Sequence, residues 1–218
     1  MPELYSAAPA YLHGDATERE HYQEAVSARL LERRASIASA LVELDAVSAP
    51  LARSAELLIT ALRSGAKVLV AGNGGSAAEA QHFAAELVGR FQRVRAPYAA
   101  LALTTDSSIL TAVANDFGYQ HVFERQVLGL GHAGDILLIF STSGESENVV
   151  RAAIAAHGRD MVVIAVTGEK ASSVESWANV TVRVPGAEAS AVQEIHMVVT
   201  HILCGIVESE LAGSGDAQ

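Results

Sequence analysis

The segment "VLVAGNGGSAAEAQHFAAELVG", residues 68–89, contains the change of pattern that decides the fold. It begins with a short apolar run, passes through a turn of Asn, Gly and Ser, and continues with apolar residues at helical spacing. A buried strand that leads through a glycine-rich turn into a helix is the repeating unit of α/β proteins. His82 and Glu86 are four residues apart, so both side chains project from one face of that helix.

Four further apolar runs follow, at residues 98–104, 135–141, 161–168 and 180–186. Each is apolar at almost every position, as is typical of parallel strands covered on both faces. Helical stretches are expected between and after them, at 76–90, 106–115 with 119–129, 146–157, 171–177 and 189–211. The alternation predicts a doubly wound, five-stranded parallel sheet flanked by helices, with ligands bound at the carboxyl ends of the strands.

The chain before the first strand predicts an N-terminal helical extension. Apolar residues recur at three- and four-residue spacing from about residue 18 to 48, and Pro50 separates this helix from a second one that ends at Gly65. We therefore expect a mobile N-terminus at residues 1–17, one domain over 18–211 that includes these helices, and a tail at 212–218.

Composition excludes several classes of protein. The chain has 218 residues, of which 50% are apolar, and a formal net charge of −10, which argues against nucleic-acid binding. Arg90, Arg93 and Arg95 still form a local basic patch that suits a small anionic ligand. The single cysteine, Cys204, permits no intrachain disulfide and fits a reducing compartment. We expect neither a signal peptide nor a membrane span, and hence a cytoplasmic protein.

The segment "STSGESENV" (141–149) places hydroxyl side chains around Gly144 where a helix begins. Helix N-termini bind anions through free N–H groups and the positive end of the helix dipole, so the pattern fits a phosphate cradle. It fits a serine-rich helix cap equally well. The segment is not a Walker loop, and "GNGGS" lacks the last glycine of a dinucleotide motif because Ala77 occupies that position.

The His82–Glu86 pair suits metal binding or acid–base chemistry, and a surface hydrogen bond is the simpler interpretation. The last helix adds Gln193, His196 and His201 as polar interruptions among apolar residues. At about 100° per residue, His201 lies about 80° from Gln193 and His196 about 60° away on the other side. Spacing alone allows either histidine to join Gln193.

The segment "TTDSSILTAVANDFGYQ" (104–120) predicts a strand end followed by a helix capped by Asp106 or a serine. Asn115 and Asp116 fall at the expected end of that helix, with Gly118 just beyond them. From spacing alone, this pair is a C-terminal turn.

Taken together, "AGNGGSAAEAQHFAAELVGRF", "LTTDSSILTAVANDFGYQHVFERQV", "DILLIFSTSGESENV" and "QEIHMVVTHILCGIVE" resemble the phosphoheptose isomerases, a family of sugar isomerase (SIS) domain proteins. The resemblance covers roughly residues 20–210, with the motifs in the family's order. It implies an aldose–ketose isomerase that converts sedoheptulose 7-phosphate to D-glycero-D-manno-heptose 7-phosphate. That is the first step toward ADP- or GDP-activated heptose, for example for lipopolysaccharide.

The resemblance also assigns site residues. It implies zinc, one ion per subunit, held by His82, Glu86, Gln193 and His201, and so prefers His201 to His196. A carboxylate in a partly dehydrated pocket suits the base of an isomerase and an imidazole suits the acid, so Glu86 is the expected base and His201 the expected acid, with exchanged roles as the alternative. The substrate contacts implied are Asn73, Gly74, Gly75, Glu86, Asn115, Asp116, Ser141, Thr142, Ser143, Ser146 and Gln193.

Two further expectations follow from the resemblance. Family members are homotetramers with active sites near subunit interfaces, and their substrate is a sugar phosphate. Glu145 replaces the commoner Asn of "STSGNS", and a negative side chain beside a bound phosphate is unfavourable unless it points to solvent. The alternative is a non-catalytic SIS-domain tetramer that acts as an adaptor for a replication initiator protein, which would not need to retain all four metal ligands.

Overall fold

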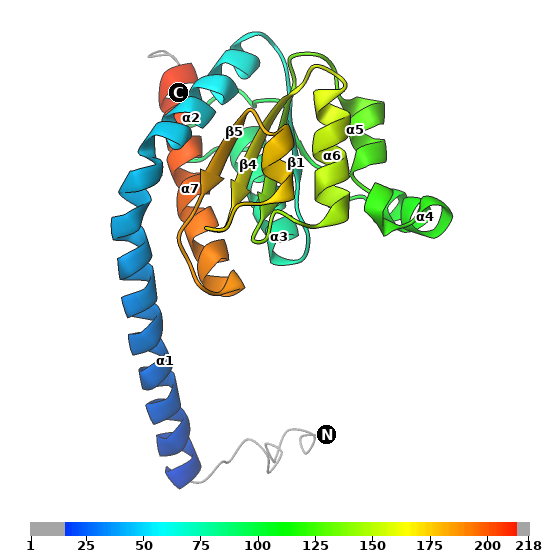
Figure 1. Cartoon of the computed structure of the whole chain (residues 1–218). Helices are drawn as coiled ribbons and strands as arrows, with labels where there is room; N and C mark the ends of the chain where they lie inside the picture. Colours follow the sequence, from blue (N-terminus) through cyan, green and yellow to red (C-terminus); the bar gives the residue numbers. More distant parts are fainter. Residues whose placement is uncertain (1–15, 213–218) are drawn as a thin grey trace, which may run out of the picture. The chain divides into compact units, whose positions relative to one another are not determined.

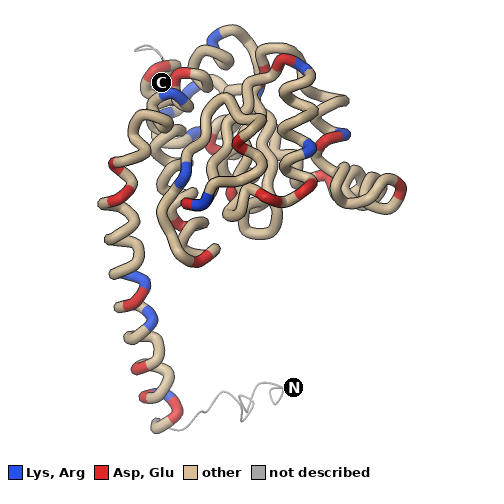
Figure 2. The backbone as a smooth tube through the Cα atoms, viewed as in Figure 1, with Lys and Arg blue, Asp and Glu red and all other residues tan. Residues whose placement is uncertain are grey.

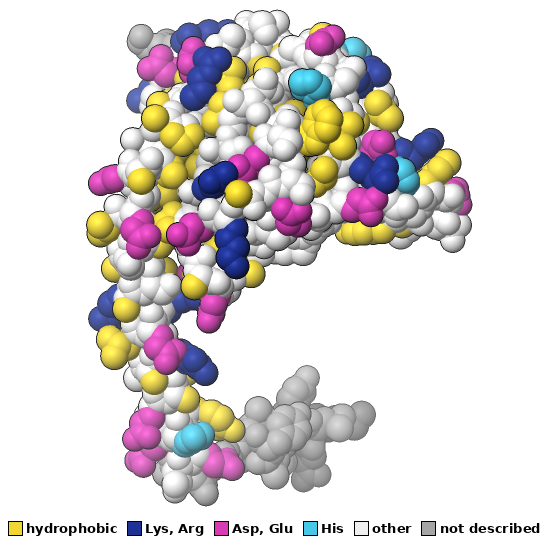
Figure 3. Space-filling model, viewed as in Figure 1, with side chains coloured by type: hydrophobic (Ala, Val, Ile, Leu, Met, Phe, Trp, Pro, Cys, Tyr) yellow, Lys and Arg dark blue, Asp and Glu magenta, His cyan; other side chains and the backbone are white. Residues whose placement is uncertain are grey.

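A computed structural model describes residues 16–212 of the chain, which divides into two units, residues 1–39 and 40–218 (Figure 1). The expected N-terminal segment 1–17 and the expected tail 212–218 lie almost wholly outside the described residues. The boundary between the two units falls within the first helix, α1 (Ala16–Glu43). Residues 17–39 of that helix have no buried side chain, and the apolar residues Tyr22 and Leu31 are exposed there. Hydrophobic side chains are visible along this helix in Figure 3.

The second unit is built on a five-stranded sheet in which every pairing is parallel, in the order β2-β1-β3-β4-β5. The strands are β1 (Val68–Ala71), β2 (Ala100–Ala102), β3 (Ile136–Ser141), β4 (Val162–Thr167) and β5 (Val180–Arg183). This confirms the predicted doubly wound sheet. The strand order reverses between β1 and β3, so the carboxyl ends of these two strands flank the position where such sheets bind ligands.

Helices cover both faces of the sheet (Figure 1). Side chains of α2 (Ser48–Arg63), α3 (Gly75–Val88) and α7 (Ala189–Leu211) share one apolar cluster with one set of alternating strand residues. The other strand residues pack against α5 (Glu124–Leu130) and α6 (Glu147–His157). The strands are apolar at nearly every position because both of their faces are buried.

The smaller elements refine the predicted boundaries. The first helix ends in the 3-10 helix η2 (Leu44–Val47), and Pro50 lies inside the first turn of α2, where its missing N–H costs nothing. Gly118, with φ of 94°, separates α4 (Ser107–Phe117) from the 3-10 helix η3 (Tyr119–His121). The predicted helix at 171–177 is the 3-10 helix η4 (Ser173–Trp177).

Two helical stretches of the described chain, Thr17–Arg63 and Ala189–Leu211, are long and apolar enough to cross a membrane by length and composition alone. The sequence analysis expects no such stretch. Half of the tested window in Ala189–Leu211 is buried inside the fold, where α7 packs with α2 and α3. Buried core helices meet the same criterion, and α7 contributes side chains to the apolar core.

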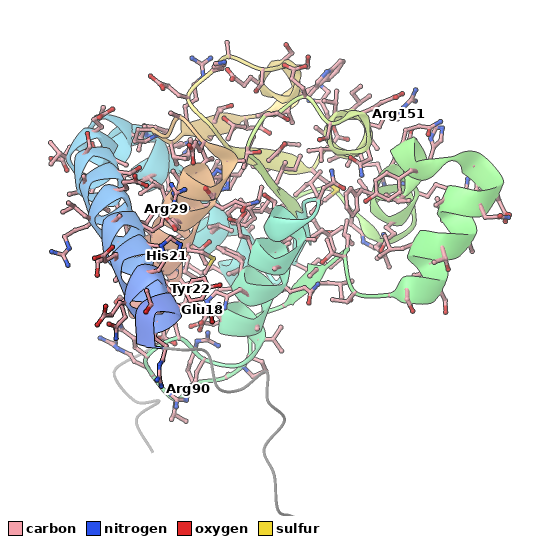
Figure 4. All side chains as sticks on the ribbon, turned by 90° about the horizontal axis from the view of Figure 1, so that it is seen from below. Glu18, His21, Tyr22, Arg29, Arg90 and Arg151 are labelled. Atoms are coloured by element: carbon pink, nitrogen blue, oxygen red, sulfur yellow. The ribbon has the colours of Figure 1, made fainter. Side chains whose placement is uncertain are left out.

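Charged residues of both signs are interspersed along the described backbone (Figure 2). Of the predicted basic patch, Arg90 is exposed and extends outward from the loop after α3 (Figure 4). The guanidinium of Arg95 is instead almost fully buried, with a side-chain exposure of 1%, and lies 3.2 Å from the carboxylate of Glu208. Arg95 is therefore a structural residue and not part of an open anion site.

Candidate functional site

The turn after β1 is held by an amide pair. Asn73 and Asn148, the latter buried in the first turn of α6, exchange two side-chain hydrogen bonds of 2.9 and 2.8 Å. The hydroxyl of Tyr119 donates a third, of 3.0 Å, to Asn73 Oδ1. Gly74 follows with φ of 56° and ψ of −119°, a conformation that favours glycine. This network joins the turns after β1 and β3, the two that flank the ligand-binding position.

The turn after β3 is shaped by its own hydroxyl groups. Ser141 is buried, and its Oγ accepts a hydrogen bond of 3.0 Å from the N–H of Gly144. Ser146 is the N-cap residue of α6, and its side chain makes no capping hydrogen bond. Thr142 and Ser143 line a cavity of about 600 Å³, which is also bordered by Lys170 and by three acidic residues, Glu145, Glu169 and Glu188. The turn thus places several hydroxyls and a helix N-terminus together, as an anion cradle requires.

Glu145 borders the same cavity, and its carboxylate is held by Ser173. Its two oxygens accept hydrogen bonds from the N–H and the hydroxyl of Ser173, at 2.8 and 2.5 Å, at the start of η4. These two bonds lower the pKa of Glu145 from its ordinary value, and the bond from the Ser173 hydroxyl has the larger effect. The carboxylate is therefore ionised at neutral pH and is directed to Ser173.

Three predicted ligands meet where α3 and α7 lie side by side. The Nε2 atoms of His82 and His201 are 3.1 Å apart, and His82 Nε2 is 3.2 Å from Glu86 Oε1. One ligand atom from each of the three lies within 4.8 Å of the others. Two ligands of a tetrahedral zinc ion lie about 3.4 Å apart, so the donor set and its spacing fit such an ion. We call His82, Glu86 and His201 the histidine–glutamate cluster.

The other two polar residues of α7 have different surroundings. His196 is completely buried, and its Nδ1 lies 3.2 Å from Glu79 Oε2. Gln193 is partly buried beside Gly75, so close that a Cβ added to this glycine would lie 2.3 Å from Gln193 Nε2. Gln193 precedes His201 by eight residues, or about 12 Å along the helix axis. The chain therefore places His201, and not His196, in the cluster, and places Gln193 beside the turn after β1.

The candidate site thus has two parts within one chain. The turns after β1 and β3 lie at the amino-terminal end of α3, whereas His82 is seven residues, or about 10 Å, farther along that helix. Asn115 and Asp116 form a third group near the end of α4, joined by a hydrogen bond of 2.7 Å, and both are exposed. None of the contacts described links this pair to the turns or to the cluster.

The sequence analysis missed several residues that hold the site. Asn148 lies inside a quoted motif, but nothing in its spacing indicates a partner 75 residues away. Phe91, whose ring stacks on His201 with centroids 5.4 Å apart, reads as an ordinary apolar residue. The sequence could have indicated Glu79, because it is an acidic residue on an otherwise apolar helix face.

Comparisons with known proteins agree with this geometry. The SIS domain family matches residues 34–168. Phosphoheptose isomerase of Bordetella avium is 50% identical over 173 residues, covering 78% of this chain and 88% of that protein. The enzyme of Dechloromonas aromatica is 48% identical over 172 residues, with the same coverage. The chain belongs to the phosphoheptose isomerase family of SIS-domain proteins.

Solved structures of the family have the same fold. Phosphoheptose isomerase from Neisseria gonorrhoeae superposes with a TM-score of 0.77 at 42% identity, covering 86% of this chain and 99% of that one. The enzyme from Francisella tularensis superposes with a TM-score of 0.81 at 37% identity, covering 84% of this chain and 98% of that one. The adaptor alternative is not favoured, because the relatives at this level of identity are named as isomerases.

Proposed function

We propose that this chain is an aldose–ketose isomerase that converts sedoheptulose 7-phosphate to D-glycero-D-manno-heptose 7-phosphate. The observation that carries the proposal is the histidine–glutamate cluster, in which a carboxylate and two imidazoles from helices far apart in sequence meet in a member of the phosphoheptose isomerase family. An adaptor protein would not need these three side chains in one place.

The chemistry requires a group that moves a proton between two neighbouring carbons. The ketose loses a proton from C1, passes through a cis-enediol and regains a proton at C2, while a second proton is exchanged between the two oxygens. Glu86, which is only partly exposed, is the proposed base at carbon, and the imidazole of His201 is the proposed acid at oxygen. The two side chains belong to one cluster, so they can act on adjacent atoms of one substrate.

Zinc is the proposed metal, one ion per subunit, with His82, Glu86 and His201 as ligands from this chain. When bound, such an ion would polarise the sugar carbonyl. Gln193 belongs to the proposed ligand set by family resemblance, and its place beside Gly75 also suits contact with the substrate.

The proposed phosphate site is the turn of Ser141, Thr142, Ser143 and Ser146, and Asn73, Gly74, Gly75, Asn115 and Asp116 are the proposed contacts to the sugar. Phosphate binding there supplies energy that positions the reacting carbons. Because these turns and the cluster lie about 10 Å apart along α3, we propose that a neighbouring subunit completes each site in a homotetramer. An open, partly apolar groove of about 700 Å³ beside His201, lined by Phe91, Val198, Ile202 and Ile206 among others, supports this assembly.

We also propose that the enzyme works in the cytoplasm and makes the first intermediate of activated heptose. A single, buried cysteine is in keeping with a reducing compartment.

The test is Glu86→Gln. We expect the variant to lose at least about a thousandfold in kcat, because the amide cannot take up the proton, while sugar-phosphate binding and the far-UV circular dichroism are retained. Turnover is followed by NMR of the product formed from sedoheptulose 7-phosphate, and zinc content is measured on the same samples.

Glu56→Gln is the matched control, since Glu56 is an exposed residue of α2 that pairs with Arg53. It should retain full activity. Near-normal turnover by Glu86→Gln at equal zinc content would refute the assignment of Glu86 as the base.

A further inference from the structure

One buried carboxylate anchors the loop that follows α3 to helix α7. Glu208 is 2% exposed, and its Oε2 accepts hydrogen bonds from the N–H groups of Gln92 and Arg93, at 2.7 and 2.9 Å. Its Oε1 accepts a third, of 3.0 Å, from the N–H of Phe91. Burial would raise the pKa of Glu208, but these three bonds and the charge of Arg95 outweigh it, so the pKa lies below its usual value.

Arg95 connects the same carboxylate to the end of α3. Its Nε lies 3.2 Å from Glu208 Oε1, and its terminal nitrogens donate to the carbonyl oxygens of Glu86 and Leu87, at 2.7 and 2.8 Å. The guanidinium also lies over the ring of Tyr98, 4.0 Å from the centroid. A basic side chain that satisfies the last carbonyls of a helix stabilises its final turn. Here that turn carries Glu86.

The loop in turn places an aromatic ring on the imidazole of His201. The rings of Phe91 and His201 are stacked, with centroids 5.4 Å apart and an angle of 22° between planes. The N–H that Glu208 Oε1 holds is that of Phe91 itself. The carboxylate therefore fixes the backbone from which the stacking ring projects.

We propose that Glu208 is a positioning residue for the histidine–glutamate cluster. It holds Phe91 against His201 on one side and, through Arg95, the last turn of α3 with Glu86 on the other. No atom of Glu208 contacts a cluster side chain in the interactions described; it acts through Phe91 and Arg95. The role of the cluster in zinc binding and isomerisation rests on the proposed function, whereas the geometry of His201 can be tested without it.

The first test is Glu208→Gln, which leaves Phe91 in the chain but replaces one acceptor oxygen with an NH₂ group. The His201 Cε1–H signal is followed by ¹³C–¹H NMR in histidine-labelled protein and assigned with His201→Gln. We expect the signal to lose the shift that the stacked Phe91 ring causes. We also expect zinc affinity to fall by about tenfold or more, since a stacked aromatic pair alone accounts for about two- to tenfold.

Phe91→Leu and Phe91→Tyr form the second test, for use in particular if Glu208→Gln does not fold. Loss of the aromatic face in Phe91→Leu should weaken zinc binding about two- to tenfold, and Phe91→Tyr should restore it. The KM for the sugar phosphate should change less than kcat in Phe91→Leu, because the phosphate turns are not touched.

Asp135→Asn is the matched control. Asp135 is also buried, at 3% exposure, accepts hydrogen bonds from the N–H groups of Lys67 and His132, and pairs with the Lys67 ammonium at the amino-terminal edge of the sheet. The Asp135→Asn substitution should lower the stability of the fold and leave both the His201 signal and the zinc affinity unchanged.

A folded Glu208→Gln protein with an unmoved His201 signal would overturn the proposal, and so would unchanged zinc affinity in Phe91→Leu. If the wild-type protein binds no zinc or has no isomerase activity, the proposed function fails, and the NMR shift still decides whether Glu208 positions His201.

Discussion

At the residue scale, side chains of one type have different roles because their surroundings differ. His196 and His201 are five residues apart on α7, yet the first is completely buried and the second is exposed. A buried imidazole needs a polar partner, and Glu79 supplies it at 3.2 Å. Glu86 lies partly exposed in the histidine–glutamate cluster instead, and Glu208 is buried among backbone N–H groups. Burial and hydrogen-bond partners, not residue type, distinguish Glu79 and Glu208 from Glu86, the proposed base.

Cys204 gives a prediction at this scale. The thiol is 1% exposed, and burial, reinforced by the negative charges of Glu86 and Glu208, raises its pKa to about 12. The thiolate is the reactive form. Native protein at pH 8 should therefore react negligibly with an aromatic disulfide reagent over an hour, whereas urea-unfolded protein should release one equivalent. Complete reaction of the native protein within minutes would contradict this placement of Cys204.

At the scale of elements, the candidate site depends on how α3 and α7 pack together. Their contacts run in sequence order: Gly75 beside Gln193, Glu79 beside His196, and His82 beside His201. The two helices are therefore aligned in the same direction, with one such contact every one or two helical turns. The middle contact, between Glu79 and His196, is buried and fixes the relative position of the outer two.

We expect Glu79→Leu to lower the free energy of unfolding by about 1–3 kcal/mol, because it leaves the buried imidazole of His196 without its partner. The double variant, Glu79→Leu with His196→Leu, should lose less free energy of unfolding than the two single variants together, since neither polar group is then buried without a partner. Urea titrations of the four proteins give the comparison. Additive losses would show that the two side chains are not coupled.

At the scale of the whole molecule, the acidic chain depends on ionised carboxylates that the fold stabilises. Burial would raise the pKa of Asp135, but hydrogen bonds and charge from Lys67 and the N–H of His132 outweigh it and lower the pKa from 3.8. The pKa of Glu208 is lowered from 4.5 in a similar way, by backbone N–H groups and the charge of Arg95. A carboxyl group whose folded pKa is depressed stabilises the fold above its unfolded pKa, and this contribution is lost as the pH falls through the folded value.

The pH dependence follows from that sign. Tm should be nearly constant above about pH 5 and should fall as the pH drops below about 4.5, where Glu208 and then Asp135 become protonated in the unfolded chain. The Asp135→Asn variant should have a lower Tm than the wild type at pH 7, and its Tm should fall less on acidification. Differential scanning calorimetry between pH 3 and 7 measures both curves. An equal or steeper acid dependence in the variant would rule out Asp135 as a contributor.

Much of the fold is determined by the sequence itself. The apolar runs of β1, β3 and β4 and the helical spacing between them specify a parallel sheet, because only a strand buried on both faces is apolar throughout. The four-residue spacing of His82 and Glu86 likewise places both on one helix face before any tertiary contact forms. These are short-range properties, and they need no knowledge of which elements become neighbours.

Only the tertiary structure decided which distant residues meet. His201 joins His82 across 119 positions of sequence, and Gln193 lies beside Gly75, because α3 and α7 pack on the same face of the sheet. The direction of the Glu145 carboxylate depends in the same way on Ser173. Helical periodicity fixes the face on which a side chain projects, but the partner on that face is set by the packing of elements, which local patterns do not contain.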